Sequence, residues 1–175
     1  DPDNDGWHNF SGSSEENCAY FPAGSQINAF MRWNDIWGSA SHDFDLRLYT
    51  ESGELVHSST SYQDGVGGDD DPFESLVYPV GASLSTGGKY CLSISKWSSA
   101  SYAGWIQLIV WDSVLEHYVT ERSLEAPAES ANPGLLTVGA SPWYASSTIQ
   151  SFSSRGPTID ERTKPDIVGV DSVYS

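Results

Sequence analysis

Short segments of alternating apolar and polar residues dominate the first two-thirds of the chain. In residues 27–33 apolar side chains occupy every second position, and residues 44–48 repeat the pattern. Alternation with a period of two indicates a half-buried β-strand, because successive side chains point to opposite faces of a sheet. Further segments with strand character, separated by turn-forming residues, cover residues 55–57, 73–78, 90–94, 105–111 and 115–119. The first part of the chain is therefore predicted to consist of short strands and turns.

No amphipathic helix interrupts these segments between residues 7 and 121. Strands without intervening helices pair antiparallel and pack as a sandwich or a barrel. We expect an all-β fold of eight or nine short strands, an antiparallel jelly-roll-like β-sandwich, assigned to residues 1–121. The apolar parity of each strand would fill the space between its two sheets.

The pattern changes after Arg122. Residues 123–132 have the composition of a short helix, and residues 135–140 form a continuous apolar run. Such a run is typical of a strand buried on both faces in a parallel sheet. We therefore expect residues 122–175 to be a truncated piece of an α/β domain.

Acidic side chains outnumber basic ones three to one, with 24 Asp and Glu against 8 Lys and Arg and a formal net charge of −16. Binding to nucleic-acid phosphates needs a basic face, and anionic membranes attract basic segments. We therefore expect neither nucleic acid nor membrane among the partners. With 38% hydrophobic and 13% aromatic residues, the composition is that of a folded chain.

The remaining composition indicates a secreted protein. Lys is rare, Ser, Gly and Tyr are abundant, and seven residues are Trp, which is typical of secreted β proteins. No apolar run reaches the ~20 residues of a transmembrane helix. The chain begins at Asp1 with neither a methionine nor a signal peptide, so we expect a mature product or an excised piece.

Two cysteines, Cys18 and Cys91, are present, and neither lies in a C-x-x-C motif. In a secreted protein a disulfide between them would close a long loop. Chain-entropy arguments give it roughly 4 kcal/mol of stability. Two unpaired thiols are the alternative, and the sequence leaves both possibilities open.

Three ordered motifs in the last third of the chain resemble the subtilisin-like serine peptidases. They are N-P-G-L-L-T-V-G-A at residues 132–140, F-S-S-R-G-P-T at residues 152–158 and K-P-D-I at residues 164–167. In that family a buried strand ending in V-G-A precedes an F-S-S-x-G-P segment, and a K-P-D segment then leads toward the nucleophile. The resemblance implies a parent protein that is a secreted endopeptidase with a Ser-His-Asp triad.

The chain lacks the motifs on which that activity depends. No Gly-Thr-Ser nucleophile segment occurs, and the family's Asp, His and oxyanion-hole Asn motifs are also absent. The family's usual A-P-G turn after K-P-D is replaced by Val168-Gly169-Val170-Asp171. We therefore expect no catalytic residue here, and no peptide hydrolysis by the chain alone.

Residues 7–121 resemble the accessory domains of secreted peptidases called pre-peptidase C-terminal domains. The matching features are Met31-Arg32-Trp33, the D-F-D-L-x-L pattern of residues 43–48, and G-K-Y-x-L-x-I at residues 88–94. The resemblance implies a non-catalytic accessory domain, inserted in the peptidase, that shapes or extends substrate binding. Its partners would be the rest of the catalytic domain and a protein or polysaccharide substrate. A carbohydrate- or protein-binding module and a calcium-stabilised spacer are the alternatives.

Calcium is the one cofactor that the sequence suggests. Asp1, Asp3 and Asp5, followed by Gly6, fit the first half of a D-x-[DN]-x-[DN]-G calcium loop. The twelfth position, a bidentate Glu in such loops, is Gly12. Residues 69–71, three consecutive Asp, are a second candidate. A solvated acidic surface is the alternative at both places.

Overall fold

The structure is a computed structural model that describes residues 1–66, 70–97, 101–124 and 126–173 of the 175-residue chain. It divides into two compact units, Asp1–Tyr118 and Val119–Ser175. The boundary expected from the sequence lies three residues later, after residue 121. None of the described helices is long and apolar enough to cross a membrane.

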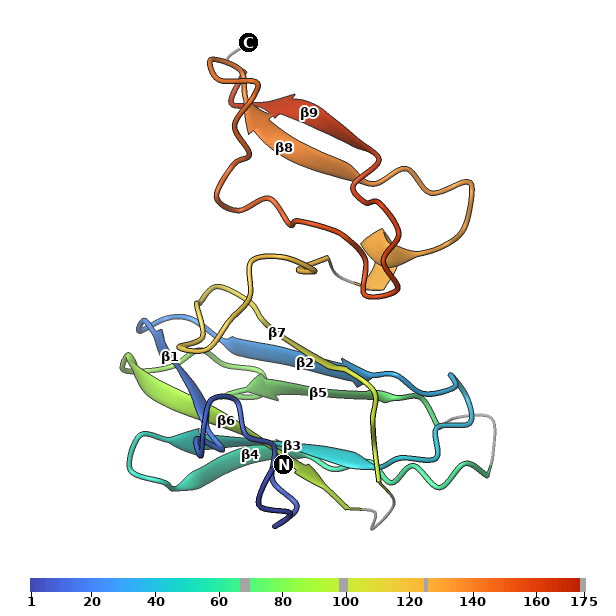
Figure 1. Cartoon of the computed structure of the whole chain (residues 1–175). Coiled ribbons are helices and arrows are strands. Elements are labelled where there is room, and N and C mark those ends of the chain that lie inside the picture. The colour runs from blue at the N-terminus through green and yellow to red at the C-terminus, as the bar shows by residue number, and fades with distance from the viewer. Residues whose placement is uncertain (67–69, 98–100, 125, 174–175) are drawn as a thin grey trace. The chain divides into compact units, whose positions relative to one another are not determined.

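The first unit is a sandwich of two antiparallel sheets (Figure 1). One sheet has the strand order β1-β6-β3-β4 and the other the order β5-β2-β7. The strands of the first sheet are β1 Asn17–Phe21, β6 Gly88–Lys96, β3 Phe44–Thr50 and β4 Leu55–Ser59. Those of the second are β5 Phe73–Tyr78, β2 Ile27–Trp33 and β7 Ile106–Val110. The all-β sandwich expected from the alternating pattern is confirmed.

The core lies between the two sheets and is built from one parity of each strand. In β2 the side chains of Ile27, Ala29, Met31 and Trp33 are at most 1% exposed, while the intervening ones are half-buried. The other sheet contributes mainly Leu46, Leu48, Leu92 and Ile94, all at most 1% exposed. Burial of so many large apolar side chains is the main stabilising contribution to the unit.

The strand prediction was wrong in two respects at the same place: one strand was missed and one predicted strand is absent. The described residues of the first unit contain seven strands, and β1 has no counterpart among the predictions. Residues 115–119, in contrast, form no strand. Their backbone instead runs beside β1, where the Glu116 N–H donates to the Cys18 carbonyl at 2.8 Å and the Asn17 side-chain amide donates to the His117 carbonyl at 2.7 Å. Isolated bonds of this kind cover β1 without forming a ladder.

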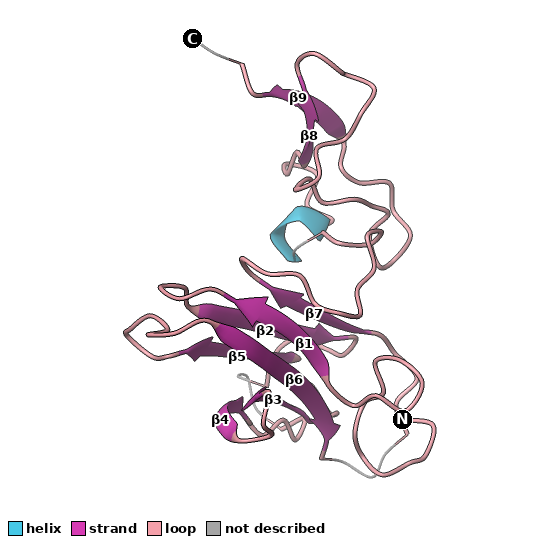
Figure 2. Ribbon diagram, turned by 90° about the vertical axis from the view of Figure 1, so that its left-hand side faces the viewer, coloured by secondary structure: helices cyan, strands magenta, loops and turns pink. Residues whose placement is uncertain are grey.

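The described residues of the second unit form one short 3₁₀-helix, η1 Ala126–Glu129, and two strands (Figure 2). Strands β8 Val138–Pro142 and β9 Ile167–Asp171 pair in parallel. The apolar run at residues 135–140 is not buried on both faces here: Val138 is 53% exposed and Leu136 is 60% exposed. Among the described residues, β8 has β9 as its single neighbour, so no further strand or helix covers these side chains.

Candidate functional site

Strands β8 and β9 are brought together by the residues that precede them. Thr137 comes directly before β8, and its N–H donates to a carboxylate oxygen of Asp166, which comes directly before β9, at 2.7 Å. The Asp166 N–H donates to the Thr137 carbonyl at 2.9 Å. The Lys164 ammonium donates to the same Asp166 oxygen at 2.6 Å and lowers the pKa of that carboxyl. The K-P-D motif therefore sets the register of the parallel pair.

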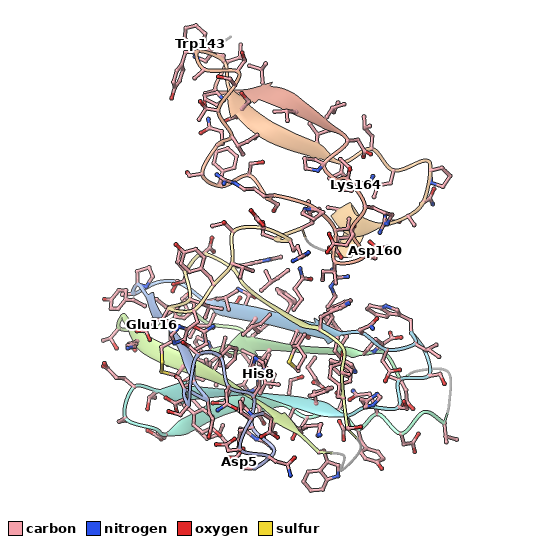
Figure 3. All side chains as sticks on the ribbon, in the orientation of Figure 1. Asp5, His8, Glu116, Trp143, Asp160 and Lys164 are labelled. Atoms are coloured by element: carbon pink, nitrogen blue, oxygen red, sulfur yellow. A yellow bond between two sulfur atoms is a disulfide. The ribbon has the colours of Figure 1, made fainter. Side chains whose placement is uncertain are left out.

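The other two motifs meet at the same place. The Ser153 hydroxyl accepts the N–H of Ala140, the alanine of V-G-A, at 3.0 Å. A Cβ at Gly139 would lie 3.0 Å from Cγ of Pro165 and 3.4 Å from the Ser153 hydroxyl. A Cβ at Gly156 would overlap the carbonyl oxygen of Lys164. At Gly156 the backbone therefore approaches another motif too closely for a side chain, and at Gly139 a Cβ would be in tight contact with Pro165. Figure 3 labels Lys164 among these loops.

The four histidines lie in the first unit, and each contacts a neighbouring ring, amide or carboxylate. His8 packs edge-on against Phe10, and His57 lies near the ring of Tyr78. The His117 N–H donates to the Asn17 side chain at 3.0 Å. The fourth, His42, contacts the carboxylate of Asp35 through its imidazole Nδ1.

The aspartate that pairs with His42 holds a loop together. The same Asp35 oxygen accepts the His42 imidazole Nδ1 and the N–H groups of Ser41 and His42, all at 2.9 Å. Burial raises the pKa of Asp35, but these donors and the N–H of Ile36 outweigh it and lower the value to about 2. The carboxylate therefore organises the loop between β2 and β3 rather than activating a nucleophile.

The N-terminal aspartates form a tight acidic turn. Carboxylate oxygens of Asp1, Asp3 and Asp5 all lie within 4.8 Å of one another, and all three side chains are exposed. The two oxygens of Asp1 accept the N–H groups of Asp5 and Gly6, each at 3.0 Å, so the turn folds back on itself. Figure 3 labels Asp5 in this turn. These oxygens are hard donors of the kind that calcium prefers. Of the second candidate, residues 69–71, Asp69 lies outside the described residues.

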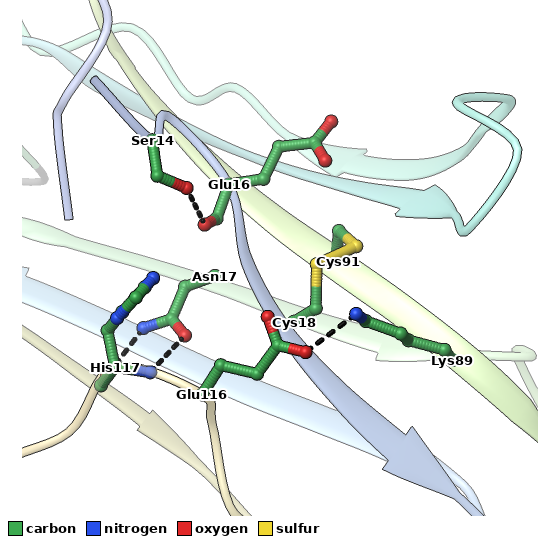
Figure 4. Close-up of a disulfide and its surroundings, with 8 residues drawn as sticks. All are labelled: Ser14, Glu16, Asn17, Cys18, Lys89, Cys91, Glu116 and His117. Carbon is green, nitrogen blue, oxygen red and sulfur yellow. Dashed lines mark hydrogen bonds and ion pairs between the residues drawn. A yellow bond between two sulfur atoms is a disulfide. The ribbon is translucent and has the colours of Figure 1, made fainter. Parts of the chain in front are cut away.

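Cys18 and Cys91 are joined by a disulfide that connects β1 to β6 (Figure 4). The two residues are direct partners in the antiparallel register. Polar contacts surround the bond: Lys89 pairs with Glu116 at 2.6 Å. The bond thus fastens the edge strand β1 to the centre of its sheet. Disulfides form and persist in oxidising compartments.

Sequence reasoning missed a buried acidic cluster at one end of the sandwich. Asp43 precedes β3 and is 3% exposed, and Glu74 in β5 is 1% exposed. Burial, with the charges of Asp45 and Glu74, raises the pKa of Asp43 to about 6 despite a bond from the Gln63 N–H. Burial also raises the pKa of Glu74. The alternation of side chains along a strand could have revealed Glu74, because it stands two residues from the core residue Leu76 and so points inward.

Aromatic side chains form a row across the outer face of the β5-β2-β7 sheet. Phe30 stacks with Phe73 at 6.4 Å between ring centroids and lies 5.0 Å from Trp111. The first pair is nearly parallel, at 25°, and the second is tilted by 48°. Phe73 is 37% exposed and Trp111 is 47% exposed, so the row contributes an apolar surface.

Comparison with solved structures gives a distant structural likeness. No protein-family model and no curated protein matches the chain. The CspB protease of Clostridium perfringens has a similar structure, with a TM-score of 0.51 and 15% sequence identity. The likeness covers 90% of this chain and 37% of that chain, so the chain spans little more than a third of the protease's length. It shows a shared fold.

Proposed function

We propose that residues 1–118 are a non-catalytic accessory domain of a secreted subtilisin-like serine endopeptidase and that residues 119–175 belong to its catalytic domain. The sandwich would shape or extend the surface that binds the protein substrate. The observation that carries the proposal is the convergence of the three peptidase-like motifs. They are far apart in the sequence, yet Ala140 bonds to Ser153 and Thr137 bonds to Asp166.

The distant likeness to a protease supports both halves of this proposal. The first unit holds 118 of the 175 residues, about two-thirds. A likeness that covers 90% of the chain therefore extends into the second unit.

A first experiment tests activity in the chain itself. Members of a catalytic triad act as a unit whose loss costs several orders of magnitude in rate. The purified chain should therefore not hydrolyse casein or a chromogenic peptide above background. Turnover that survives repurification and is blocked by a serine-directed inhibitor would contradict the proposal.

A second experiment tests the accessory role in the full-length protein. The protein with and without residues 1–118 would be compared on casein and on a short chromogenic peptide. Loss of an extended binding surface should lower kcat/KM for casein at least ~10-fold and leave the short peptide within ~2-fold, because only the long substrate reaches beyond the catalytic cleft. An equal loss on both substrates would indicate a folding role instead.

The aromatic row favours a second function, direct binding of polysaccharide or protein by the sandwich. Rings on a sheet face bind sugars by stacking and peptides by apolar contact. Phe73→Ala should weaken retention on an insoluble polysaccharide or a protein matrix. Tyr20→Ala should not, although it also removes an aromatic ring, one that is 65% exposed on β1 of the other sheet. Equal retention of both variants would exclude this face.

A further inference from the structure

The core of the sandwich contains a carboxylate, Glu74, for which the described residues supply no basic partner. Glu74 accepts hydrogen bonds from the Ser59 hydroxyl, from the Ser61 N–H at 2.8 Å and from the Gln63 side-chain amide at 3.2 Å. All three donors are neutral. An ionised carboxylate that is 1% exposed is costly to hold in a protein interior unless an opposite charge is present.

Gln63 connects this carboxylate to a second one. Its side-chain amide donates to Glu74, and its backbone N–H acts on the Asp43 carboxylate by opposing the rise of its pKa. Asp43 and Gln63 are 3% and 5% exposed. Two basic groups close to Asp43 in the sequence are already engaged, since Arg47 pairs with Asp45 at 2.7 Å and His42 pairs with Asp35 at 2.9 Å.

Two oxygen atoms of the same cluster have no hydrogen-bond partner. They are Oδ1 of Asp43 and Oε1 of Gln63, both fully buried, and neither accepts a bond from any group in the part of the chain that the structure describes. A buried oxygen without a donor is rare in folded proteins and calls for a specific explanation. The Gln63 amide contacts Glu74 through its nitrogen, which leaves its oxygen as the unpaired atom of that side chain.

We propose that Asp43, Gln63 and Glu74 bind a calcium ion between the start of β3 and β5. Two carboxylates and a neutral amide oxygen form an all-oxygen ligand set, which suits a hard divalent cation. The ion supplies the positive charge that both carboxylates lack and the partner that the two unpaired oxygens lack. Each carboxylate oxygen has more than one lone pair, so Glu74 keeps its hydrogen bonds.

Calcium at this position links the two sheets. Asp43 leads into β3 of the four-stranded sheet, Glu74 belongs to β5 of the three-stranded sheet, and Gln63 lies in the loop between β4 and β5. The loop is also tied to the one between β2 and β3, because the Ser39 hydroxyl donates to the Gly65 carbonyl at 3.2 Å. The ion therefore orders the acidic loop end of the sandwich.

The test uses the whole chain with Asp3→Ala and Asp5→Ala, which removes the N-terminal turn as a competing site. Titration calorimetry with calcium chloride should find one site per chain, and the melting temperature should rise by about 5–10 °C at 100 times the Kd. Adding Asp43→Asn should abolish both effects. Glu54→Gln, an exposed acid at the far turn of β4, should leave both unchanged.

Melting with and without calcium separates binding from a folding defect. In chelator, the chain that also carries Asp43→Asn should melt at or above the temperature of the chain with Asp3→Ala and Asp5→Ala alone, because it lacks an uncompensated buried charge. In calcium, the chain without Asp43→Asn should melt higher. If the melting temperature of the chain without Asp43→Asn responds to acidification but not to calcium, the cluster holds a proton and the proposal is wrong. The same follows if magnesium or sodium at equal ionic strength gives the same shift, or if Asp43→Asn retains the site.

Discussion

The two units of the chain differ in where their apolar side chains lie. In the sandwich, the large side chains of β2 and β3 face an opposing sheet and are almost completely buried, Trp33 at 1% and Leu46 at 0% exposure. In the second unit, the apolar residues of β8 and β9 face no opposing layer among the described residues, and Val170 is 60% exposed. The sandwich is stabilised by its own core.

The second unit is held together by a different kind of interaction. Its strand pair depends on side chain–backbone bonds among the motif residues, such as those of Thr137 with Asp166 and Ala140 with Ser153. Bonds of this kind contribute about 0.5–1.5 kcal/mol each, and up to about 3 kcal/mol where a charged group takes part. These bonds fix the register of the two strands but contribute little to the free energy of unfolding. A two-stranded ribbon is marginally stable without a covering layer, so we expect the second unit to be less stable than the sandwich.

A matched pair of leucine substitutions tests this difference most directly. Leu46→Ala removes a fully buried side chain from the sandwich core and should lower the free energy of unfolding by about 2–5 kcal/mol. Leu136→Ala removes one that is 60% exposed and should change it by less than about 0.5 kcal/mol. Urea denaturation followed by tryptophan fluorescence measures both. Equal costs would mean that the second unit has a core of its own.

The alternating pattern predicted the sandwich core well because its physical cause is local. Each residue of β2 faces inward or outward according to parity alone, and all four predicted inward residues are buried. Strand β1 escaped the same reasoning because its outward positions, Cys18 and Tyr20, are not polar. Cys18 is buried in its disulfide to β6, whereas Tyr20 is 65% exposed, so no alternation of apolar and polar residues marks the strand.

The candidate sites were harder to predict. The sequence alone does not bring Asp43, Gln63 and Glu74 together, because they come from three separate segments and their proximity depends on the pairing of the strands. The N-terminal turn was predictable because Asp1, Asp3 and Asp5 are neighbours in the chain. The family resemblance identified the three motifs of the second unit from the sequence. The close contacts at Gly139 and Gly156 show where these motifs meet in the structure.

Removal of the disulfide should affect the sandwich and spare the second unit. Cys18→Ser with Cys91→Ser frees a loop with a sequence separation of 73 residues and should cost about 4 kcal/mol, mainly by enlarging the unfolded ensemble. Thermal melting with and without a reductant gives the same comparison for the unmodified chain. Hydrogen exchange should show faster amides in β1 and β6 and unchanged amides in β8. An unchanged melting temperature would contradict this prediction.

Gly156→Ala should have the converse effect. Its Cβ would overlap the Lys164 carbonyl oxygen, so one motif must move away from the other at a cost of about 1–3 kcal/mol. The amides of Thr137 and Ala140 should then exchange faster, and those of β2 should not change. Gly134→Ala is the control, because its Cβ would meet a side-chain oxygen of Asn132 at 3.3 Å. Equal exchange in the two variants would argue against the close approach.

Acid should weaken the sandwich through Asp35. Its pKa is lowered from 3.8 to about 2 in the folded state, so the ionised carboxylate stabilises the fold above pH 4. That contribution is lost as the pH falls from about 4 to about 2. Asp35→Asn should flatten the fall of the urea midpoint across this window, by on the order of 1 kcal/mol. Glu54→Gln should keep the original profile, and a profile of Asp35→Asn that matches it would contradict the role given to Asp35.

The smallest expected effect concerns the N-terminal acidic turn. Its three carboxylates are exposed and lack the bidentate Glu at the twelfth position, where Gly12 stands, so calcium affinity should be weak, with a Kd of about 10⁻⁴–10⁻³ M. In a chain that carries Asp43→Asn, millimolar calcium should raise the melting temperature of the sandwich by about 1–2 °C. Sodium chloride of equal ionic strength should give less, because screening responds to any salt. Adding Asp3→Ala and Asp5→Ala should remove the difference between the two salts. If the difference persists, the turn is not the site, and if calcium and sodium act alike from the start, the turn is a solvated acidic surface.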